Sequence, residues 1–303
     1  SDIRSLTGEQ VREIITVVDQ SGYIFVASVR ENLTLGVSDV SDTVCLDMLS
    51  RMNLSTWFDS LPSGLDTHLG ERGITVSAGE RQRINMARAL LRRTPIYIMD
   101  EPTANLDPVS VEKIEELVIR INRELGTTIL FSTHDMYQGQ RLAHRIAVLM
   151  NGRFAQVGTP REVFTLPATR DLARFVGIEN ILEGVVMGRE DGGIASIDVG
   201  STRVRARSSF GPGEKVALCI RPEDMQIAPA ERGVGNPGRN TLQGTIISIV
   251  PRGPFSRVTV DCGFMLSSIL SWKKVDDLEL QEGSLVVVSF APESVHVVSA
   301  GES

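Results

Sequence analysis

The sequence has few cysteines, no long apolar run and no excess of positive charge, and each absence narrows what the protein can be. Its three cysteines in 303 residues, Cys45, Cys219 and Cys262, follow no metal-ligand spacing. We therefore expect free thiols in a reducing compartment. We also expect no signal peptide and no membrane-spanning helix. A net charge of −7 disfavours a general nucleic-acid-binding protein, so any membrane association is expected to come through protein partners.

Glycine followed by lysine is also missing. None of the 27 glycines precedes a lysine, so the sequence has no G-x-x-x-x-G-K-[ST] motif. In that motif backbone N–H groups surround phosphates and the lysine neutralises them. We expect either that a preceding amino-terminal part of the protein carries this motif, or that the motif is truly lost.

The strongest positive feature is a predicted buried strand that ends in two carboxylates. Residues 96–99 are apolar, Asp100 and Glu101 follow directly, and Pro102 stops the strand. Acidic groups at the carboxyl end of a parallel strand face the ligand crevice. There one carboxylate can hold magnesium and the next can orient a water for attack on a phosphate. The alternative is a strand end that is acidic by chance.

A predicted helix start lies upstream of this strand. Ser77 and Glu80 have capping-box spacing. The apolar residues that follow share one helical face. Because Ala78 and Gly79 are small, the same helix start can admit a phosphate close to its free backbone N–H groups. Helix capping alone is the alternative interpretation.

Two single residues complete the pattern. His134 follows an apolar strand predicted over residues 127–132, and Gln20 closes the apolar run at residues 14–18. A lone histidine beside a strand end is more often structural than catalytic, and glutamine is common on surfaces. Neither residue is specific by itself.

Taken in chain order, Gln20, the loop at Ser77, Asp100 with Glu101, the segment 104–107 and His134 resemble the motifs of ABC-transporter ATPases. The usual glycine and glutamine of the family's signature loop are Ala78 and Glu80 here, so the Glu80 carboxylate must avoid facing the phosphate. The resemblance implies ATP and Mg²⁺ as cofactors. It implies metal contacts from Asp100 and Gln20, catalytic roles for Glu101 and His134, and nucleotide contacts from Gln20, Ser77, Ala78, Gly79, Glu80 and Asp107.

The fold predicted for residues 1–178 is an incomplete P-loop NTPase of the α/β class with a helical subdomain over residues 22–73. Tyr23, Phe25 and Val26 are candidate contacts there for a transmembrane partner, or ordinary core residues. Asp107 is expected to cap a crossover helix that Gly126 ends. An Asn-Gly pair at residues 151–152 predicts a hairpin turn. Residues 61–73 look more like an exporter-type segment than an importer-type one.

Residues 179–303 are predicted to form an all-β, barrel-like domain built from two repeats. Residues 180–186 match residues 240–246, and spaced residues of 213–227 align with those of 283–297. The repeat resembles the regulatory module called TOBE or MOP-like that follows many importer ATPase domains, and residues 219–224 are its most recognisable run. The module favours an importer over an exporter.

The second repeat looks most like that of molybdate or tungstate uptake ATPases, while sulfate, iron and sugar importers stay open. Ser267, Ser268, Lys273 and Lys274 are candidate oxyanion contacts, or simply solvated strand and turn residues. The resemblance implies a homodimer at the cytoplasmic face of the membrane, with transmembrane permease subunits and, indirectly, an extracytoplasmic solute-binding protein. The alternatives are a non-catalytic oxyanion sensor on an ATPase scaffold, and an exporter-type or soluble ABC protein.

Overall fold

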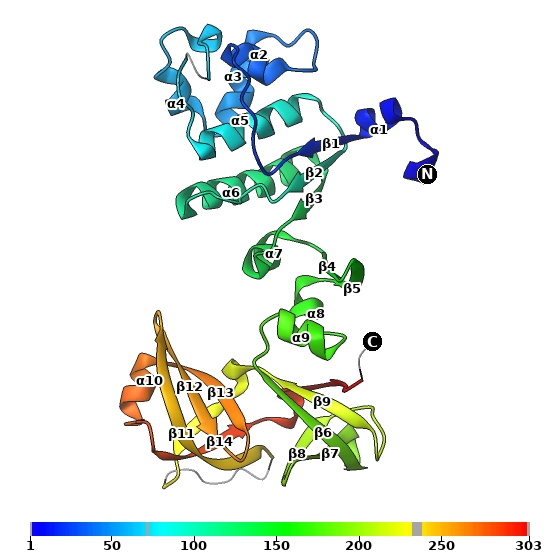
Figure 1. Cartoon of the computed structure of the whole chain (residues 1–303), viewed down its shortest axis with the longest axis vertical. Coiled ribbons are helices and arrows are strands. Elements are labelled where there is room, and N and C mark those ends of the chain that lie inside the picture. Colours follow the sequence, from blue (N-terminus) through cyan, green and yellow to red (C-terminus); the bar gives the residue numbers. More distant parts are fainter. Residues whose placement is uncertain (1, 71–72, 232–237, 302–303) are drawn as a thin grey trace. The chain divides into compact units, whose positions relative to one another are not determined.

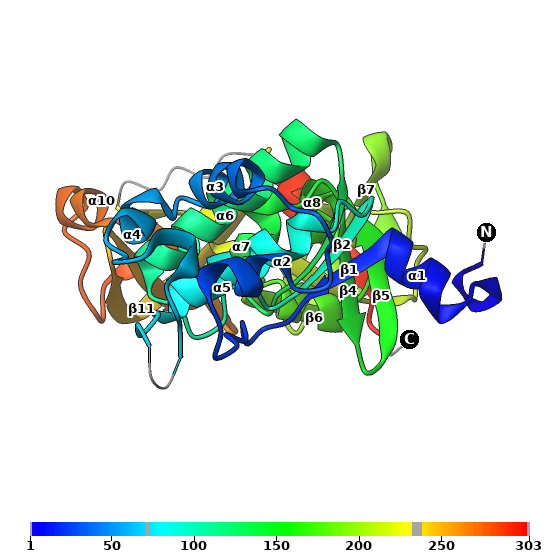
Figure 2. The same cartoon turned by 90° about the horizontal axis from the view of Figure 1, so that it is seen from above.

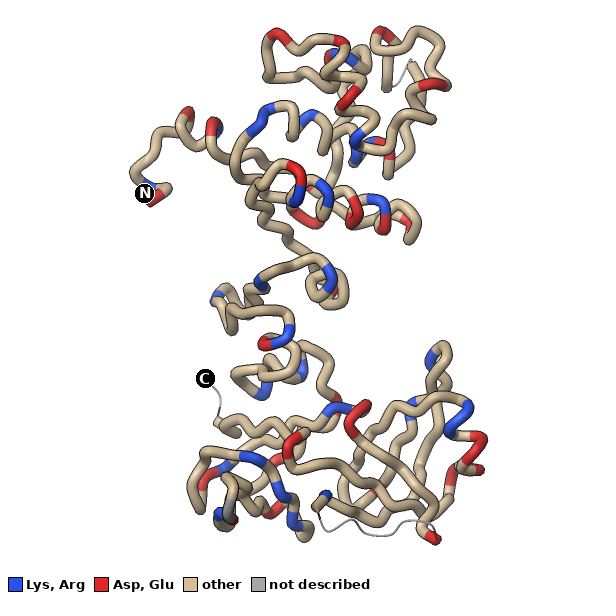
Figure 3. The backbone as a smooth tube through the Cα atoms, turned by 180° about the vertical axis from the view of Figure 1, so that it is seen from behind, with Lys and Arg blue, Asp and Glu red and all other residues tan. Residues whose placement is uncertain are grey.

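The structure, a computed structural model, describes residues 2–70, 73–231 and 238–301. The chain forms two compact units, residues 1–142 and 143–303 (Figure 1). Residues 71 and 72 of the exporter-like segment lie outside the described residues. The first unit mixes helices with a parallel sheet and the second is mostly antiparallel β structure, so the predicted fold class is confirmed. Acidic and basic residues are interspersed over both units (Figure 3).

A three-stranded parallel sheet organises the first unit. Its order is β1 (Ile15–Val18), β2 (Ile96–Asp100) and β3 (Thr128–Ser132). The register sets Val18 beside Met99 and Asp100 beside Ser132. Because all three strands run the same way, the residues that follow them meet at one edge of the sheet.

Two long helices cover one face of this sheet. Helices α5 (Ala78–Leu91) and α6 (Pro108–Leu125) pack against the strands and against each other (Figure 1, Figure 2). Tyr97 and Met99 point into this core and are at most 1% exposed. Alternate residues of the strands point to the opposite face, where Val17 and Leu130 are 55% and 60% exposed.

Helix α6 begins and ends where the sequence predicts. Asp107 caps its first turn, and Gly126 ends it in the left-handed conformation at φ +61°. The apolar face of α6 is buried at Ile114 and Ile121. Leu125, the last residue of that face, is instead 48% exposed, because it lies in the final turn of the helix.

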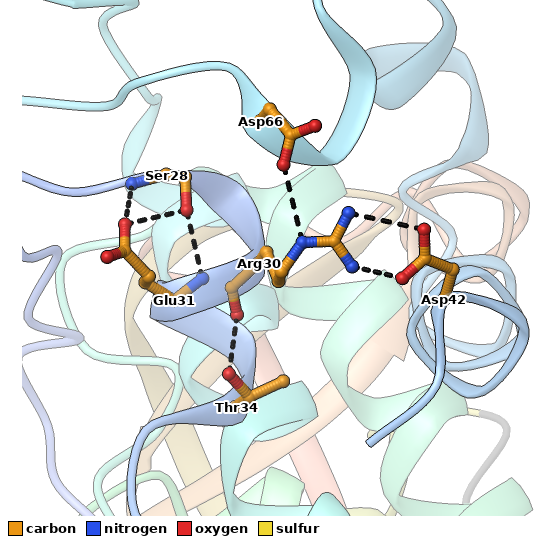
Figure 4. Close-up of polar contacts among 6 residues, drawn as sticks. All are labelled: Ser28, Arg30, Glu31, Thr34, Asp42 and Asp66. Atoms are coloured by element: carbon orange, nitrogen blue, oxygen red, sulfur yellow. Dashed lines mark hydrogen bonds and ion pairs between the residues drawn. The ribbon is translucent and has the colours of Figure 1, made fainter. Parts of the chain in front are cut away.

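The described residues of the predicted helical subdomain form three short helices, α2 (Val29–Thr34), α3 (Asp42–Arg51) and α4 (Ser55–Asp59), with a 3₁₀ turn at Gly64–Asp66. Ser28 and Glu31 form a capping box at the start of α2. Figure 4 shows the Arg30 guanidinium between Asp42 and Asp66, with an Nε to Oδ1 distance of 3.3 Å to Asp66. These contacts fasten α2 to the start of α3 and to the 3₁₀ turn, both of which follow it in the chain.

The remaining elements of the first unit are a 3₁₀ turn at Ile3–Ser5, α1 (Gly8–Ile14) and α7 (Met136–Leu142). None of the helices among the described residues has the length and apolar character needed to cross a bilayer.

The second unit starts with a hairpin and two short helices. Strands β4 (Ile146–Met150) and β5 (Arg153–Gly158) pair around Asn151 and Gly152, both at positive φ, which confirms the predicted turn. Helices α8 (Pro160–Thr165) and α9 (Arg170–Phe175) follow. The predicted domain boundary at residue 178 stays a prediction, since the compact units divide the chain at residue 142 by packing alone.

Two five-stranded antiparallel sheets form the rest of the second unit. The first has the order β15-β9-β6-β7-β8 and the second β10-β14-β11-β12-β13. The strands of the first sheet are β6 (Asn180–Arg189), β7 (Ile194–Val199), β8 (Thr202–Arg207), β9 (Lys215–Ile220) and β15 (Val295–Ser299). Those of the second are β10 (Gln226–Pro229), β11 (Asn240–Arg252), β12 (Phe255–Asp261), β13 (Met265–Ser271) and β14 (Leu285–Phe290). The short helix α10 (Trp272–Asp277) follows β13, and 3₁₀ turns lie at Asp191–Gly193, Pro222–Asp224 and Pro292–Ser294.

The two repeats exchange their last strands. Strand β10 follows β9 in the chain but pairs with β14 of the second repeat, and β15 pairs with β9 of the first. One hydrophobic core runs through both sheets. The two copies therefore make one domain, as the repeat predicts.

A matching asparagine at the start of each repeat ties the repeats together. The Asn180 amide donates to the Ser267 carbonyl at 2.9 Å and accepts from the Ser267 N–H at 2.6 Å. The Asn240 amide makes the same pair of bonds with the Arg205 backbone, at 2.8 and 2.7 Å. Both asparagines are at most 5% exposed, so these bonds are made away from water, where unpaired polar groups are costly.

Candidate functional site

The acidic pair lies at the carboxyl edge of the parallel sheet and is joined to the neighbouring strand by Ser132. The Ser132 hydroxyl donates to Asp100 Oδ1 at 2.6 Å and accepts from the Glu101 N–H at 2.9 Å. One hydroxyl therefore fixes both the carboxylate and the backbone that follows it. The role of Ser132 was not predicted from the sequence. The available signal was its position at the end of a parallel strand, two residues before His134.

Glu101 and His134 face each other across the same edge. His134 Nδ1 lies 3.2 Å from Glu101 Oε1, and the two side chains are 80% and 34% exposed, His134 being the more exposed. An exposed pair of this kind adds little to stability. What it provides is geometry: a carboxylate and an imidazole held together at the ends of adjacent strands.

The backbone of Glu101 is strained. Its φ of +39° lies in the left-handed region, which costs free energy for a residue with a side chain. The Ser132 hydroxyl holds the Glu101 N–H, and the Glu101 carbonyl accepts from the Ala104 N–H at 3.0 Å. Strain that the surroundings enforce is typical of functional sites.

A separate cleft of about 350 Å³ contains Gln20. Three segments line it: Gln20 to Gly22, residues 102 and 104–106 of the loop after β2, and the start of α5 with Ala78, Arg81 and Gln82. Gly22 is needed here, because a Cβ at this position would lie 2.9 Å from the Arg81 carbonyl oxygen. The structure thus brings Gln20 and Ala78 to one cleft, whose lining does not include Asp100, Glu101 or His134.

The start of α5 holds the Glu80 carboxylate in a capping box with Ser77. Glu80 Oε2 accepts from the Ser77 N–H at 2.9 Å, and the Ser77 hydroxyl accepts from the Glu80 N–H. Glu80, which the sequence places at a position of the expected signature loop, is therefore part of a capping box. The backbone N–H groups of Ala78 and Gly79 lie in the first turn between these two residues, where an anion is favoured.

Asp107 lies next to this helix start. It accepts from the Ser110 N–H at 3.0 Å as the cap of α6, and bonding to Ser110 lowers the pKa of its carboxyl. A Cβ at Gly79 would lie 2.6 Å from Ser110 Oγ. The first turns of α5 and α6 are therefore in close contact, and only glycine fits between them.

The donor set at Asp100 suits a magnesium ion held mainly by a nucleotide. No group of three or more His, Cys, Asp or Glu side chains in the described part of the chain can hold a metal ion. Magnesium in phosphate sites uses one or two carboxylates plus phosphate oxygens and water, so such a group is not required. The Asp100 carboxylate, fixed through Oδ1 by Ser132, fits that limited role, whereas Gln20 lines the separate cleft, whose lining does not include Asp100. Arg81, whose role was not predicted from the sequence, adds positive charge to the cleft that contains Gln20.

The candidate oxyanion contacts in the second unit are partly used within the fold. Ser268 is 1% exposed and its hydroxyl donates to the Met225 carbonyl. The Ser267 N–H donates to Asn180. Lys273 and Lys274 belong to the exposed side of α10. Two of the expected donors are therefore committed to holding the sheets together.

Two protein families match the chain. The ABC transporter family matches residues 1–104, and the TOBE domain family matches residues 218–298. The first match covers β1, β2 and the acidic pair but ends before β3 and His134, and the second match covers the second repeat.

Individual relatives align with this chain over most of its length. A molybdate/tungstate import ATP-binding protein (WtpC) from Pyrococcus horikoshii is 34% identical over 236 residues, which cover 77% of this chain and 65% of the relative. A spermidine/putrescine import ATP-binding protein (PotA) from Nitratidesulfovibrio vulgaris is 30% identical over 79% of this chain and 66% of its own length. A PotA from Spiroplasma citri is 28% identical over 95% and 77%. The chain thus spans about two thirds of the length of the first of these relatives. The chain thus carries an ABC transporter match at residues 1–104, which includes the acidic strand end, and a TOBE domain match at residues 218–298, and it is similar to import ATP-binding proteins.

Proposed function

We propose that the chain is part of the ATP-hydrolysing subunit of an ABC importer that takes up an oxyanion, molybdate or tungstate. The subunit would act as a homodimer on the cytoplasmic face of the membrane, joined to permease subunits and served by an extracytoplasmic solute-binding protein. The observation that carries the proposal is the 3.2 Å contact between Glu101 and His134 at the ends of adjacent parallel strands. This is where a phosphate-cleaving site needs a water-orienting group beside a phosphate-sensing one.

Each site residue has a distinct role in this proposal. When bound, ATP with Mg²⁺ supplies the bond to be broken and the charge that neutralises the phosphates. Glu101 orients and deprotonates the attacking water, while His134 donates toward the terminal phosphate and keeps Glu101 in place. Asp100 and Gln20 are the protein contacts of the metal. Asp107 holds the first turn of α6 against α5.

The homodimer completes the site in this proposal. Ser77, Ala78, Gly79 and Glu80 of one subunit offer their helix start to the nucleotide held by the other subunit. The capping box fixes the Glu80 carboxylate on the Ser77 N–H, and in this proposal the N–H groups of Ala78 and Gly79 are the ones that contact the nucleotide. Arg81 adds a positive charge beside the same turn.

Tyr23, Phe25 and Val26 support a permease contact. They are 64%, 37% and 65% exposed, although apolar residues favour the core. The Arg88 guanidinium lies 5.1 Å from the centre of the Phe25 ring and donates to the Tyr23 carbonyl at 3.0 Å. A rigid apolar patch of this kind is typical of a protein interaction surface.

The direct test of the proposal is solute uptake. The complete protein, assembled with its permease and solute-binding protein in lipid vesicles, should accumulate radiolabelled tungstate when ATP is enclosed on the side of this subunit. Spermidine and putrescine are the matched competitors, because relatives named for polyamines are similarly close. Accumulation of polyamine but not of tungstate would reassign the substrate, and no ATP-dependent uptake of either would contradict the importer proposal.

Ser132 provides a further test of the acidic edge. Ser132→Ala removes the hydroxyl that fixes Asp100 and the Glu101 N–H, so the concentration of Mg²⁺ needed for half-maximal ATP hydrolysis should rise about 10- to 100-fold, as for other residues that orient metal ligands. Ser132→Thr keeps a hydroxyl and should stay near the parent value. A magnesium titration of the ATPase rate measures both variants, and equal responses would exclude this role for the hydroxyl.

A further inference from the structure

The geometry points to Gln138 as a positioning residue that sets the spacing between Glu101 and His134. Gln138 lies in α7, one turn after His134, and is 2% exposed. Glutamine is rarely buried unless its amide is hydrogen-bonded. The inference rests on the proposed function for the catalytic role of Glu101 and His134, while the contacts of Gln138 are independent of that function.

The Gln138 amide joins two loops of the site. Its Oε1 accepts from the Thr103 hydroxyl at 3.2 Å, and its Nε2 lies 3.1 Å from the same oxygen. Thr103 follows Glu101 by two residues, on the other side of the buried Pro102. The loop that carries the carboxylate and the helix that follows the imidazole are therefore bonded to each other directly.

A second contact anchors the same amide to α6. Gln138 Nε2 donates to Glu115 Oε1 at 3.0 Å, and Arg141 Nε donates to Glu115 Oε2 at 3.2 Å. The Glu115 side chain is only 12% exposed. Hydrogen bonding to Glu115 also raises the pKa of Arg141. The charged pair fixes the Glu115 carboxylate, and the carboxylate in turn fixes the orientation of the amide.

These hydrogen bonds also fix the position of the loop that carries His134. His134 is 80% exposed, so its own surroundings hold it weakly. Asp135, the next residue, accepts from the N–H groups of Tyr137 and Gln138 at 2.8 and 3.1 Å. The start of α7 is thus bonded back to the histidine loop, and Gln138 bonds α7 to the glutamate loop. Small errors in placing catalytic groups lower rates strongly.

The test uses Gln138→Met, which keeps the volume of the side chain and removes its hydrogen bonds. In the assembled importer, kcat for ATP hydrolysis should fall about tenfold or more while KM for ATP changes less than about twofold. Thr103→Val should act in the same direction, and Thr103→Ser, which keeps the hydroxyl, should retain the parent rate. The control is Thr94→Val, which removes a buried hydrogen bond to Thr16 at the opposite edge of the same sheet.

A readout independent of ATP hydrolysis separates this inference from the proposed function. The chain has four histidines, so the His134 ring can be followed by nuclear magnetic resonance in the 303-residue protein. Glu101→Gln should move the His134 ring signals in the parent and in Thr94→Val, and should move them less than half as far in Gln138→Met or Thr103→Val. An undiminished response in both latter variants would overturn the positioning role, even if the importer hydrolyses ATP. If the shift of the His134 signals is diminished but the assembled importer does not hydrolyse ATP, the positioning role stands and the proposed function is contradicted.

Discussion

Glu101→Gln should lower kcat for ATP hydrolysis by at least about a hundredfold, the effect of removing a general base, while ATP binding stays within about twofold. Glutamine has nearly the shape of glutamate and can still bond to His134, whose Nδ1 lies 3.2 Å from the carboxylate. It carries no negative charge and cannot take a proton from the attacking water. Phosphate release from the assembled importer and the ATP dissociation constant are the two measurements.

The matched control is Glu112→Gln, at an exposed position of α6, which should leave kcat unchanged. The two substitutions remove the same charge from the same unit, so a difference between them assigns the loss to the site and not to net charge. Steady-state hydrolysis at the parent rate by the Glu101 variant would defeat the proposed catalytic role.

Ending the chain at Ser294 should unfold the second unit. Strand β15 pairs along its whole length with β9, and Val295 and Val298 are 2% and 4% exposed in two different clusters of the core. Loss of two buried valines and of the ladder bonds removes about 5 kcal/mol or more. That approaches the whole stability of an ordinary domain, so we expect no cooperative thermal transition for this unit.

Hydrogen exchange measures this outcome at the affected strand. The β9 amides should lose their protection in the shortened chain, because the strand becomes an open edge beside an exposed core. A chain ending at Gly301 keeps β15 and its contact from the His296 ring to the Pro167 carbonyl at 2.8 Å, and it should exchange like the parent. Full protection of the β9 amides in the shortened chain would mean that the unit folds without β15.

The sequence predicts best the features that are set locally. The Asp107 cap, the Gly126 end and the Asn151 turn follow from residue chemistry within a few positions, and the structure has all three. The acidic strand end is predictable for the same reason. It combines an apolar run, two carboxylates and a proline within seven residues, 96–102.

Features that depend on pairing between distant segments are harder to predict. Ser132 reaches Asp100 only because β3 lies beside β2 in this register, and nothing near Ser132 in the sequence shows the neighbour. The exchange of β10 and β15 has the same cause. The similarity between the two repeats shows which segments correspond, but it does not show whether a strand pairs within its own repeat or with the other one. The Gln138 amide bonds to residues 35 and 23 positions away, beyond the range of any local pattern.

The hydrogen bonds of Asn180 and Asn240 between the two repeats bear on how such a domain arises. Every bond that Asn180 makes to the second copy is matched by one from Asn240 to the first, and each copy lends the other one strand. Because each copy makes the same contacts to the other, these contacts do not require that the copies be covalently linked. A gene encoding a single copy would specify the same body as a pair of identical chains, and fusing two such genes would turn an association that depends on concentration into a permanent one.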